Sequence, residues 1–351
     1  MRFKAEGELG SQHSSTGPIQ RFNAPTHSAF VGIMRASFWK AFWLTMRPYL
    51  IFVSGAAGLV GLSFVPSLRP AQFLLAFPPL LLSYGLGQAL TDCFQTDTDA
   101  ISSPYRPLVR GIVARKQVLA VSLSGLFLGI GVLAFMNPLI LAVGGTAVLG
   151  LMSYTIFKKK WWGGPFWNSW IVALLPVIGR MVDPGFQLKQ AFPLGDSQSL
   201  AFISAVLAVH FGYGNFVVMG YLKDISADRR TGYRTFPVVF GWKATAFYSD
   251  ALALAAALFT GLALFSLGAR NRIALAVLIT ACTVSVLAQV KIHRIRDERL
   301  AYGPIACVVR TFILYSLAVV IAQGKLWIVF AAAFYLFFEA ALRCRPEKTQ
   351  V

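Results

Sequence analysis

The amino-acid sequence predicts an all-α protein, a polytopic membrane bundle of nine to ten transmembrane helices. Of the 351 residues, 56% are hydrophobic and only 13% are charged, and the apolar residues gather in long stretches. An ordinary soluble domain is about 45–50% apolar and about 25% charged. The charge of this chain is therefore too small to cover a soluble surface, and its composition excludes disordered, collagen-like and disulfide-stapled proteins.

Ten stretches approach the roughly 20 apolar residues that a membrane span requires. They cover residues 49–66, 71–91, 117–136, 138–157, 166–180, 199–222, 244–267, 272–290, 304–322 and 325–342. The 166–180 stretch is short, and the last two stretches follow each other closely. Nine and ten crossings therefore both remain open.

The net charge is +18, and the distribution of the basic residues along the chain indicates how the protein is oriented in the membrane. If the N-terminus is cytoplasmic and the stretches alternate, 25 of the 32 Lys and Arg residues face the cytoplasm and six face the opposite side. Such an excess is the positive-inside rule. It predicts that both termini and the loops after the second and sixth stretches are cytoplasmic, and it favours a lipid bilayer over nucleic acid as the partner of the basic residues.

The N-terminal part divides into two segments. Residues 1–28 are polar, lack the apolar core of a signal peptide, and are expected to form a disordered tail. Residues 29–47 mix aromatic residues with Arg and Lys, which is typical of an amphipathic helix at the membrane interface. The transmembrane domain is expected to cover residues 48–345.

Acidic residues are rare and clustered. Five of the 14 lie in two short segments that follow the second and sixth stretches, namely Asp92, Asp97, Asp99, Asp224 and Asp228. The i, i+4 spacing of Asp224 and Asp228 places them one turn apart on a helix. Carboxylate oxygens in small number, with room for water and phosphate oxygens, are typical of Mg²⁺ sites.

Basic residues accompany both acidic segments. Arg106 and Arg110 follow the first segment, whereas Lys223, Arg229 and Arg230 surround the second. Carboxylates interleaved with Arg and Lys indicate a site that binds phosphate through a metal ion and adjacent cations. The alternative is a set of solvated surface ion pairs.

A third polar patch ends the fourth stretch. It contains Tyr154, Lys158 and Lys160 and is followed by Asn168. Lys158 or Lys160 is expected to reach the same phosphate, with Tyr154 one turn deeper, near a reacting carbon. The alternative is that these lysines only anchor the helix at the membrane surface.

These three patches resemble the landmarks of the UbiA superfamily of intramembrane prenyltransferases. The run DAISSPYRPL at 99–108 resembles its first aspartate-rich motif, and DISADRRTGYRTFPVVFG at 224–241 is similar to its second. The first motif of the family usually reads N-D-x-x-D-x-x-x-D. In this chain Thr91 replaces the Asn and Gln95 replaces the central Asp, while Asp92 and Asp99 remain.

The resemblance implies a helical bundle around a central cavity in which Mg²⁺ ions grip an isoprenoid diphosphate. The metal ligands would be Thr91, Asp92, Gln95, Asp99, Asp224 and Asp228. The diphosphate would be bound by Arg106, Lys160, Lys223 and Arg229. Tyr154 and Lys158 would be the catalytic residues, acting where the diphosphate leaves an allylic carbocation that an acceptor captures.

The resemblance leaves the reaction open. The enzyme is expected to transfer the prenyl group to a small aromatic or lipophilic acceptor, and the alternative is a UbiA-type terpene cyclase that needs no acceptor. A membrane transporter is the rival from another class, but its acids would lie near the midplane instead of at helix ends. Within the last stretches, Arg310 and Glu339 are expected to form a buried ion pair.

Overall fold

A computed structural model describes residues 33, 35–186, 196–268 and 271–345. Within these residues the chain is helical, with no β-strand. Each of the ten apolar stretches forms a helix. These are α3 Ile51–Ser63, α4 Pro70–Asp92, α6 Arg115–Ala134, α7 Leu139–Lys158, α8 Gly163–Arg180, α9 Ser197–Tyr221, α11 Phe236–Ser266, α12 Arg272–Arg294, α13 Tyr302–Ala322 and α14 Leu326–Arg343.

Eight of these helices are long and apolar enough to span a membrane, α3 and α8 being the exceptions among the described residues. The chain is thus an integral, multi-pass membrane protein, and the predicted all-α fold is confirmed. The described residues also form three short α-helices and one 3-10 helix. α2 Ala36–Thr45 precedes the bundle, and α5 Thr96–Ser102, α10 Ile225–Arg230 and η2 Glu298–Leu300 lie in connecting segments.

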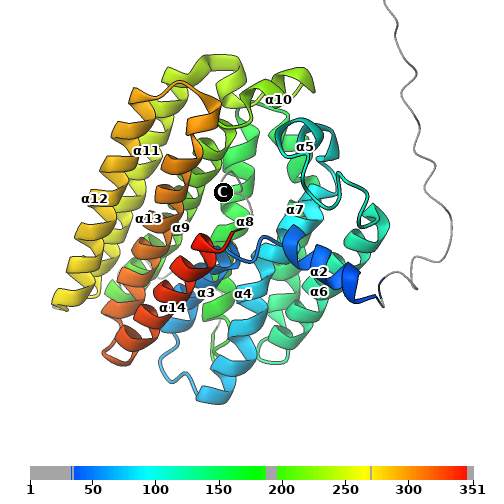
Figure 1. The fold of residues 1–351 in the computed structure, drawn as a ribbon. Coiled ribbons are helices and arrows are strands. Elements are labelled where there is room, and N and C mark those ends of the chain that lie inside the picture. The colour runs from blue at the N-terminus through cyan, green and yellow to red at the C-terminus, as the bar shows by residue number, and fades with distance from the viewer. Residues whose placement is uncertain (1–32, 34, 187–195, 269–270, 346–351) are drawn as a thin grey trace, which may run out of the picture.

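The long helices form one bundle in which α3, α8 and α9 lie between two outer groups (Figure 1). One outer group contains α4, α6 and α7, and the other contains α11, α12 and α13. The short helices α5 and α10 contact each other at one end of the bundle. The two acidic segments, which are more than 120 residues apart in the sequence, are therefore brought together.

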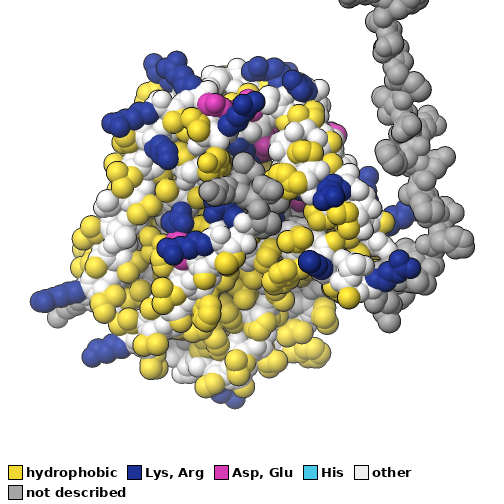
Figure 2. Space-filling view, in the orientation of Figure 1, with side chains coloured by type: hydrophobic (Ala, Val, Ile, Leu, Met, Phe, Trp, Pro, Cys, Tyr) yellow, Lys and Arg dark blue, Asp and Glu magenta, His cyan; other side chains and the backbone are white. Residues whose placement is uncertain are grey.

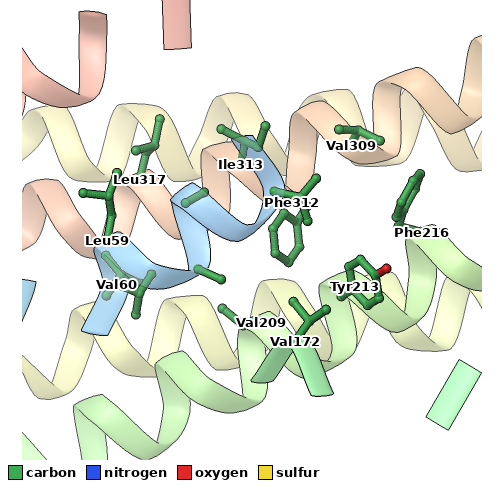
Figure 3. Close-up of a cluster of buried hydrophobic side chains, with 14 of the residues drawn as sticks. Leu59, Val60, Val172, Val209, Tyr213, Phe216, Val309, Phe312, Ile313 and Leu317 are labelled. Carbon is green, nitrogen blue, oxygen red and sulfur yellow. The ribbon is translucent and has the colours of Figure 1, made fainter. Parts of the chain in front are cut away.

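The core lies where α3, α8, α9 and α13 meet (Figure 3). Leu59 of α3, Val209 of α9 and Phe312 of α13 are all buried there. In the outer helices α6, α12 and α14, by contrast, only 22% of the apolar window is buried inside the protein. The burial pattern explains why α3 can be short: neighbouring helices, and not lipid, surround it.

Glycine allows α3 and α8 to approach backbone to backbone. A Cβ atom placed on Gly61 would lie 2.0 Å from the carbonyl oxygen of Pro176, and one on Gly179 would lie 2.6 Å from that of Gly58. No side chain fits at such a distance. Helices α3 and α8 can therefore pack this closely only because glycine has no side chain at these positions.

Helix α2 lies within the segment 29–47, for which the sequence predicts an interfacial helix, and it buries one of its faces. Phe38 and Phe42 are buried against the bundle, whereas Trp39 and Trp43 are 50% and 47% exposed. Paired half-exposed tryptophans are typical of a helix at a membrane interface. The tail expected over residues 1–28 lies outside the described residues.

The expected ion pair between Arg310 and Glu339 is present. Arg310 donates to Glu339 through Nε at 2.6 Å and Nη2 at 2.9 Å, and Tyr335 donates to the same carboxylate. This bidentate contact joins α13 to α14 and satisfies charges that lipid would not tolerate alone.

Charged side chains are unevenly spread over the surface. Figure 2 shows a group of Lys and Arg side chains over the end of the molecule that carries α5 and α10, and a broad hydrophobic area over the lower sides of the helices. Further Lys and Arg side chains lie over the middle of this face and near the opposite end. The few acidic side chains visible in this view lie mainly near the end that carries α5 and α10.

The contact between α3 and α8 yields a stability prediction. Gly61→Ala is expected to lower the free energy of unfolding by about 2 kcal/mol, because the added methyl group must push the α8 backbone away. Gly145→Ala in α7 is the control, since its Cβ would meet no atom within 4 Å and alanine favours a helix. Thermal unfolding in one detergent checks both variants. Equal midpoints for the wild type and Gly61→Ala would contradict the packing.

Candidate active site

One large cavity opens beside the end of the bundle that carries the acidic segments. Its volume is about 960 Å³, and α2, α4, α6, α7, α8 and α9 all contribute to its wall. Polar and charged side chains line the end near α5 and α10, whereas Leu80, Leu133 and Ile178 lie toward the opposite end. We call this space the central cavity. It is within the usual size range of ligand pockets.

Asp92 ends α4 and is held by three side chains. Arg47 donates from Nη2 to both of its carboxylate oxygens at 2.9 Å, and Gln88 donates to Oδ1 at 2.8 Å. Arg106 lies 3.6 Å from the same oxygen. Asp92 is only 3% exposed, so these partners provide the polar contacts that water would otherwise supply.

Arg106 connects Asp92 to Asp99. Its Nη1 forms an ion pair with Asp99 of α5 and also faces Asp92, so that one nitrogen bridges two buried carboxylates. Burial alone would lower the pKa of Arg106, but Asp99 and Asp92 raise it above its ordinary value. The guanidinium is therefore held in its charged form.

Lys158, at the end of α7, joins the two acidic segments. Its Nζ donates to Oε1 of Gln95 at 2.8 Å and lies 3.8 Å from Oδ1 of Asp228. The rings of Tyr221 and Tyr233 lie within 6 Å of this ammonium group. Gln95, which stands where the family has an Asp, accepts a hydrogen bond from Lys158 without adding charge.

Asp228 lies behind Lys158 and does not line the central cavity. It is fully buried, and its Oδ2 accepts a hydrogen bond from Thr235 at 3.0 Å. No hydrogen bond within the described residues reaches Oδ1, which faces Lys158. Burial raises the pKa of Asp228 to about 6, against the opposing effects of Lys158 and Thr235. The geometry thus gives Asp228 the position of an anchor for Lys158.

Lys223 and Asp224 do line the central cavity. They follow α9 and precede α10, at the point where the second acidic segment begins. Burial lowers the pKa of Lys223 to about 8, although Asp224 opposes this. A cation and a carboxylate are therefore presented side by side at the mouth of the cavity.

Aromatic hydroxyl groups line the next layer of the cavity. The hydroxyls of Tyr154 and Tyr221 are 2.9 Å apart, and Asn168 donates to the hydroxyl of Tyr213 at 3.4 Å. All four side chains contribute to the wall. Tyr154 lies one helical turn below Lys158, as predicted, between the charged end and the apolar depth.

Two predicted diphosphate ligands are not at the cavity. Lys160 and Arg229 are exposed and absent from its wall, and Nζ of Lys160 lies over the rings of Phe157 and Trp162. Helix α7 ends at Lys158, so Lys160 lies beyond the helix that directs Lys158 into the site. Thr91 does line the cavity, but its hydroxyl donates to the backbone oxygen of Gln88.

Sequence reasoning missed Arg47, Gln88 and Tyr221. Arg47 was assigned to the end of the interfacial helix, yet its side chain points to Asp92. Its φ of 52° is the one positive value at a non-glycine position among the described residues, and such strain collects at functional sites. Gln88 lies one turn before Asp92, a spacing that was visible in the sequence.

The side-chain oxygens at this site can supply only part of the coordination of a metal ion such as Mg²⁺. Among the described residues no three His, Cys, Asp or Glu side chains lie close enough to hold a metal ion. Asp92 and Asp99 nevertheless converge on one positive group, Nη1 of Arg106. Mg²⁺ is commonly bound through one or two carboxylates together with water and substrate phosphates, and this set of oxygens suits that mode.

Carboxylates and cations at the mouth of an apolar, membrane-embedded cavity define a class of protein: an enzyme that handles an anionic group attached to a hydrophobic chain. The chain belongs to the UbiA prenyltransferase family, whose model matches residues 49–303. It is therefore a membrane prenyltransferase of the UbiA type.

Relatives and solved structures agree with this assignment. Digeranylgeranylglyceryl phosphate synthase of Pyrococcus abyssi is 25% identical over 226 residues, which cover 60% of this chain and 73% of that enzyme. The enzyme of the same name from Natronomonas pharaonis is 30% identical over 199 residues, covering 56% and 67%.

The fold is shared with solved UbiA homologues. The homologue from Aeropyrum pernix K1 aligns with a TM-score of 0.65 at 19% identity, covering 77% of this chain and 96% of that one. A homologue from Archaeoglobus fulgidus, bound to GPP and Mg²⁺, aligns with a TM-score of 0.59 at 16% identity, covering 80% and 99%.

The contact between Lys158 and Asp228 predicts a double-variant effect. Lys158→Met is expected to lower the free energy of unfolding at pH 8 by about 3 kcal/mol, because it leaves a buried carboxylate unpaired. Adding Asp228→Asn removes that charge and is expected to recover much of the loss. Thermal unfolding is the measurement, with Lys160→Met as the exposed control. Strict additivity of the two substitutions would show that the pair does not interact.

Proposed function

We propose that the protein is a Mg²⁺-dependent enzyme that ionises a prenyl diphosphate and transfers the prenyl group to a lipophilic acceptor. The observation that carries this proposal is the division of the central cavity into a charged end and an apolar depth. A diphosphate requires the first and an isoprenoid chain requires the second. Solvated ion pairs alone would not account for such an enclosed apolar space beside them.

The length of the cavity limits the prenyl chain that it can hold in extended form. Along α4 its wall runs from Pro78 to Asp92, fourteen steps or about 21 Å at 1.5 Å per residue, and the apolar part from Pro78 to Gly87 takes about 14 Å of this. An isoprene unit adds four chain bonds, and because three backbone bonds advance a peptide by about 3.5 Å, one unit spans about 5 Å. The apolar part therefore holds about three extended units, and a fourth requires the chain to bend. The names of the relatives support the geranylgeranyl donor that we propose.

The chemistry follows from the charges. As the bond between the prenyl carbon and the diphosphate oxygen breaks, the oxygen keeps the electron pair and negative charge grows on the leaving group. Arg106, Lys158 and Lys223 offer fixed positive charge at that end. Such preorganised charge is among the largest contributions to catalysis. The hydroxyl-bearing rings of Tyr154 and Tyr221 lie one layer deeper, where they face the allylic cation.

Asp92 and Asp99 would hold one Mg²⁺ ion and Asp224 would contribute to the binding of a second, each together with water and diphosphate oxygens. Thr91 and Gln95, which also line the cavity, would add neutral oxygens. The metal ions would neutralise the diphosphate and assist its departure. Asp228 would act through Lys158, and Lys160 and Arg229 would stay outside the site. These roles refine the ligand set predicted from the sequence.

The acceptor that we propose is a lipophilic alcohol with a glyceryl phosphate head. The support is that the relatives are named digeranylgeranylglyceryl phosphate synthase, a name that describes geranylgeranyl groups on glyceryl phosphate. The apolar wall near Trp39 and Trp43 of α2 is half exposed, which would let a lipid-like acceptor enter from the bilayer. A prenyl group captured by the acceptor oxygen forms an ether, and the hydroxyl proton is released.

We also propose how the chain is divided into segments and how it is oriented in the membrane. Residues 48–345 would form the catalytic membrane domain, preceded by the interfacial segment 29–47 and the tail 1–28. Both termini and the α5 and α10 segments would face the cytoplasm, in line with the excess of basic residues at that end (Figure 2).

Removal of a site carboxylate predicts loss of activity. Asp92→Asn and Asp224→Asn are each expected to lower the rate of diphosphate release from geranylgeranyl diphosphate with Mg²⁺ by about 100-fold or more. Asp97→Asn is the matched control, because Asp97 is exposed and does not line the cavity. Purified protein and a diphosphate-release assay are required. Wild-type activity in Asp224→Asn would overturn its assignment.

Product analysis by mass spectrometry separates the possible reactions. Product that forms only with a glyceryl phosphate lipid supports the proposed acceptor, whereas dependence on an aromatic acceptor replaces it. A cyclic hydrocarbon formed without any acceptor identifies a terpene cyclase. Absence of diphosphate release under every condition would overturn the proposal as a whole.

A further inference from the structure

The loop between α12 and α13 contacts the second acidic segment. Glu298, in the short helix η2, accepts hydrogen bonds from the backbone N–H of Ser226 through both carboxylate oxygens at 3.1 Å. The hydroxyl of Ser226 donates to Oε2 at 2.7 Å. Three contacts across 72 residues of sequence thus join Glu298 to the first turn of α10.

These hydrogen bonds use the backbone N–H of Ser226, which is a donor that an N-cap residue at Asp224 would normally bind. Asp224 is the N-cap residue of α10, and an N-cap aspartate typically accepts a hydrogen bond from the second or third amide of its own helix. Its side chain makes no such bond to the described helix, and Ser226 supplies that second amide to Glu298 instead. The helix is capped from a distant segment.

The other aspartate N-caps of the described helices follow the local rule. Asp196 at the start of α9 accepts from the amides of Gln198 and Ser199, and Asp297 at the start of η2 accepts from the amide of Arg299. Asp224 has the same residue type and position but another backbone conformation, because its ψ is 11°, whereas ψ is 132° at Asp196 and 124° at Asp297. The difference coincides with the place of Asp224 in the wall of the central cavity.

We propose that Glu298 is a positioning residue that keeps the Asp224 carboxylate turned toward the central cavity by capping α10 in its place. This rests on the proposed function, in which Asp224 contributes to metal binding. Without Glu298, the amide of Ser226 becomes available, and rotation of the Asp224 backbone to the extended conformation of the other aspartate caps lets its side chain accept from that amide. Each molecule that does so has one oxygen ligand fewer for the cation.

Binding of Mn²⁺ to the full-length protein in the presence of inorganic diphosphate tests this, with electron paramagnetic resonance reporting free Mn²⁺. Because a local N-cap is worth about a factor of five to ten in an equilibrium, Glu298→Ala is expected to weaken Mn²⁺ binding about fivefold or more. Glu298→Gln keeps an acceptor oxygen and is expected to bind within about twofold of the wild type.

Two controls separate positioning from general effects. Asp297→Asn removes the neighbouring charge of the same loop but keeps the oxygen that accepts from the Arg299 amide and caps η2, and it is expected to leave Mn²⁺ affinity unchanged. In an Asp224→Asn background, Glu298→Ala is expected to have no further effect, because the residue through which Glu298 acts is already altered. A loop that merely fastens α10 would weaken binding in both backgrounds.

The outcomes that overturn the inference are distinct from those that overturn the proposed function. Wild-type Mn²⁺ affinity in Glu298→Ala, an equal loss in Glu298→Gln, or a full loss in the Asp224→Asn background would each overturn the positioning role. Absence of Mn²⁺ binding by the wild type would overturn both proposals. Normal binding without prenyl transfer would overturn the proposed function alone.

Discussion

Charge buried beside an apolar cavity is the constraint on which this structure depends. A carboxylate in such surroundings costs several kcal/mol unless a cation faces it. Asp92 and Asp99 share Arg106, and Asp228 faces Lys158. Because these partners come from separate elements, α4, α5, α7 and α10 must all meet at one end of the bundle. The core of α3, α8, α9 and α13 supports them, and Tyr221 of α9 extends that core to the Lys158 ammonium group.

The fold was predictable because few backbone conformations are stable inside a lipid bilayer. Backbone groups in lipid must be satisfied within the segment, so long apolar stretches have to be helices. All ten stretches, including the short 166–180, became helices. What composition could not reveal is that α3 and α8 are enclosed by protein. That depends on Gly61 and Gly179, whose importance appears only when the two backbones are side by side.

The site was predictable where residue type and spacing coincide. The acidic segments could be predicted because carboxylates are rare in this chain and lie at helix ends. Lys158 could be predicted because it also lies at the end of an apolar stretch. The remaining contacts depend on direction and distance in space. Arg47 reaches Asp92 from a turn with positive φ, 45 residues away, and Glu298 reaches α10 across 72 residues. Contacts between residues so far apart in the sequence follow no helical repeat, so no sequence pattern could reveal them.

The cation between the first two carboxylates has a consequence for the proposed function. Arg106 already occupies the space between Asp92 and Asp99, so a metal ion bound by these carboxylates would have to take the place of one positive charge. A diphosphate bound together with the metal would remove that conflict, because the guanidinium could then pair with phosphate oxygens. In the proposed function, metal and diphosphate would therefore bind together, and until then the ion pairs to Arg106 balance the charge of the site.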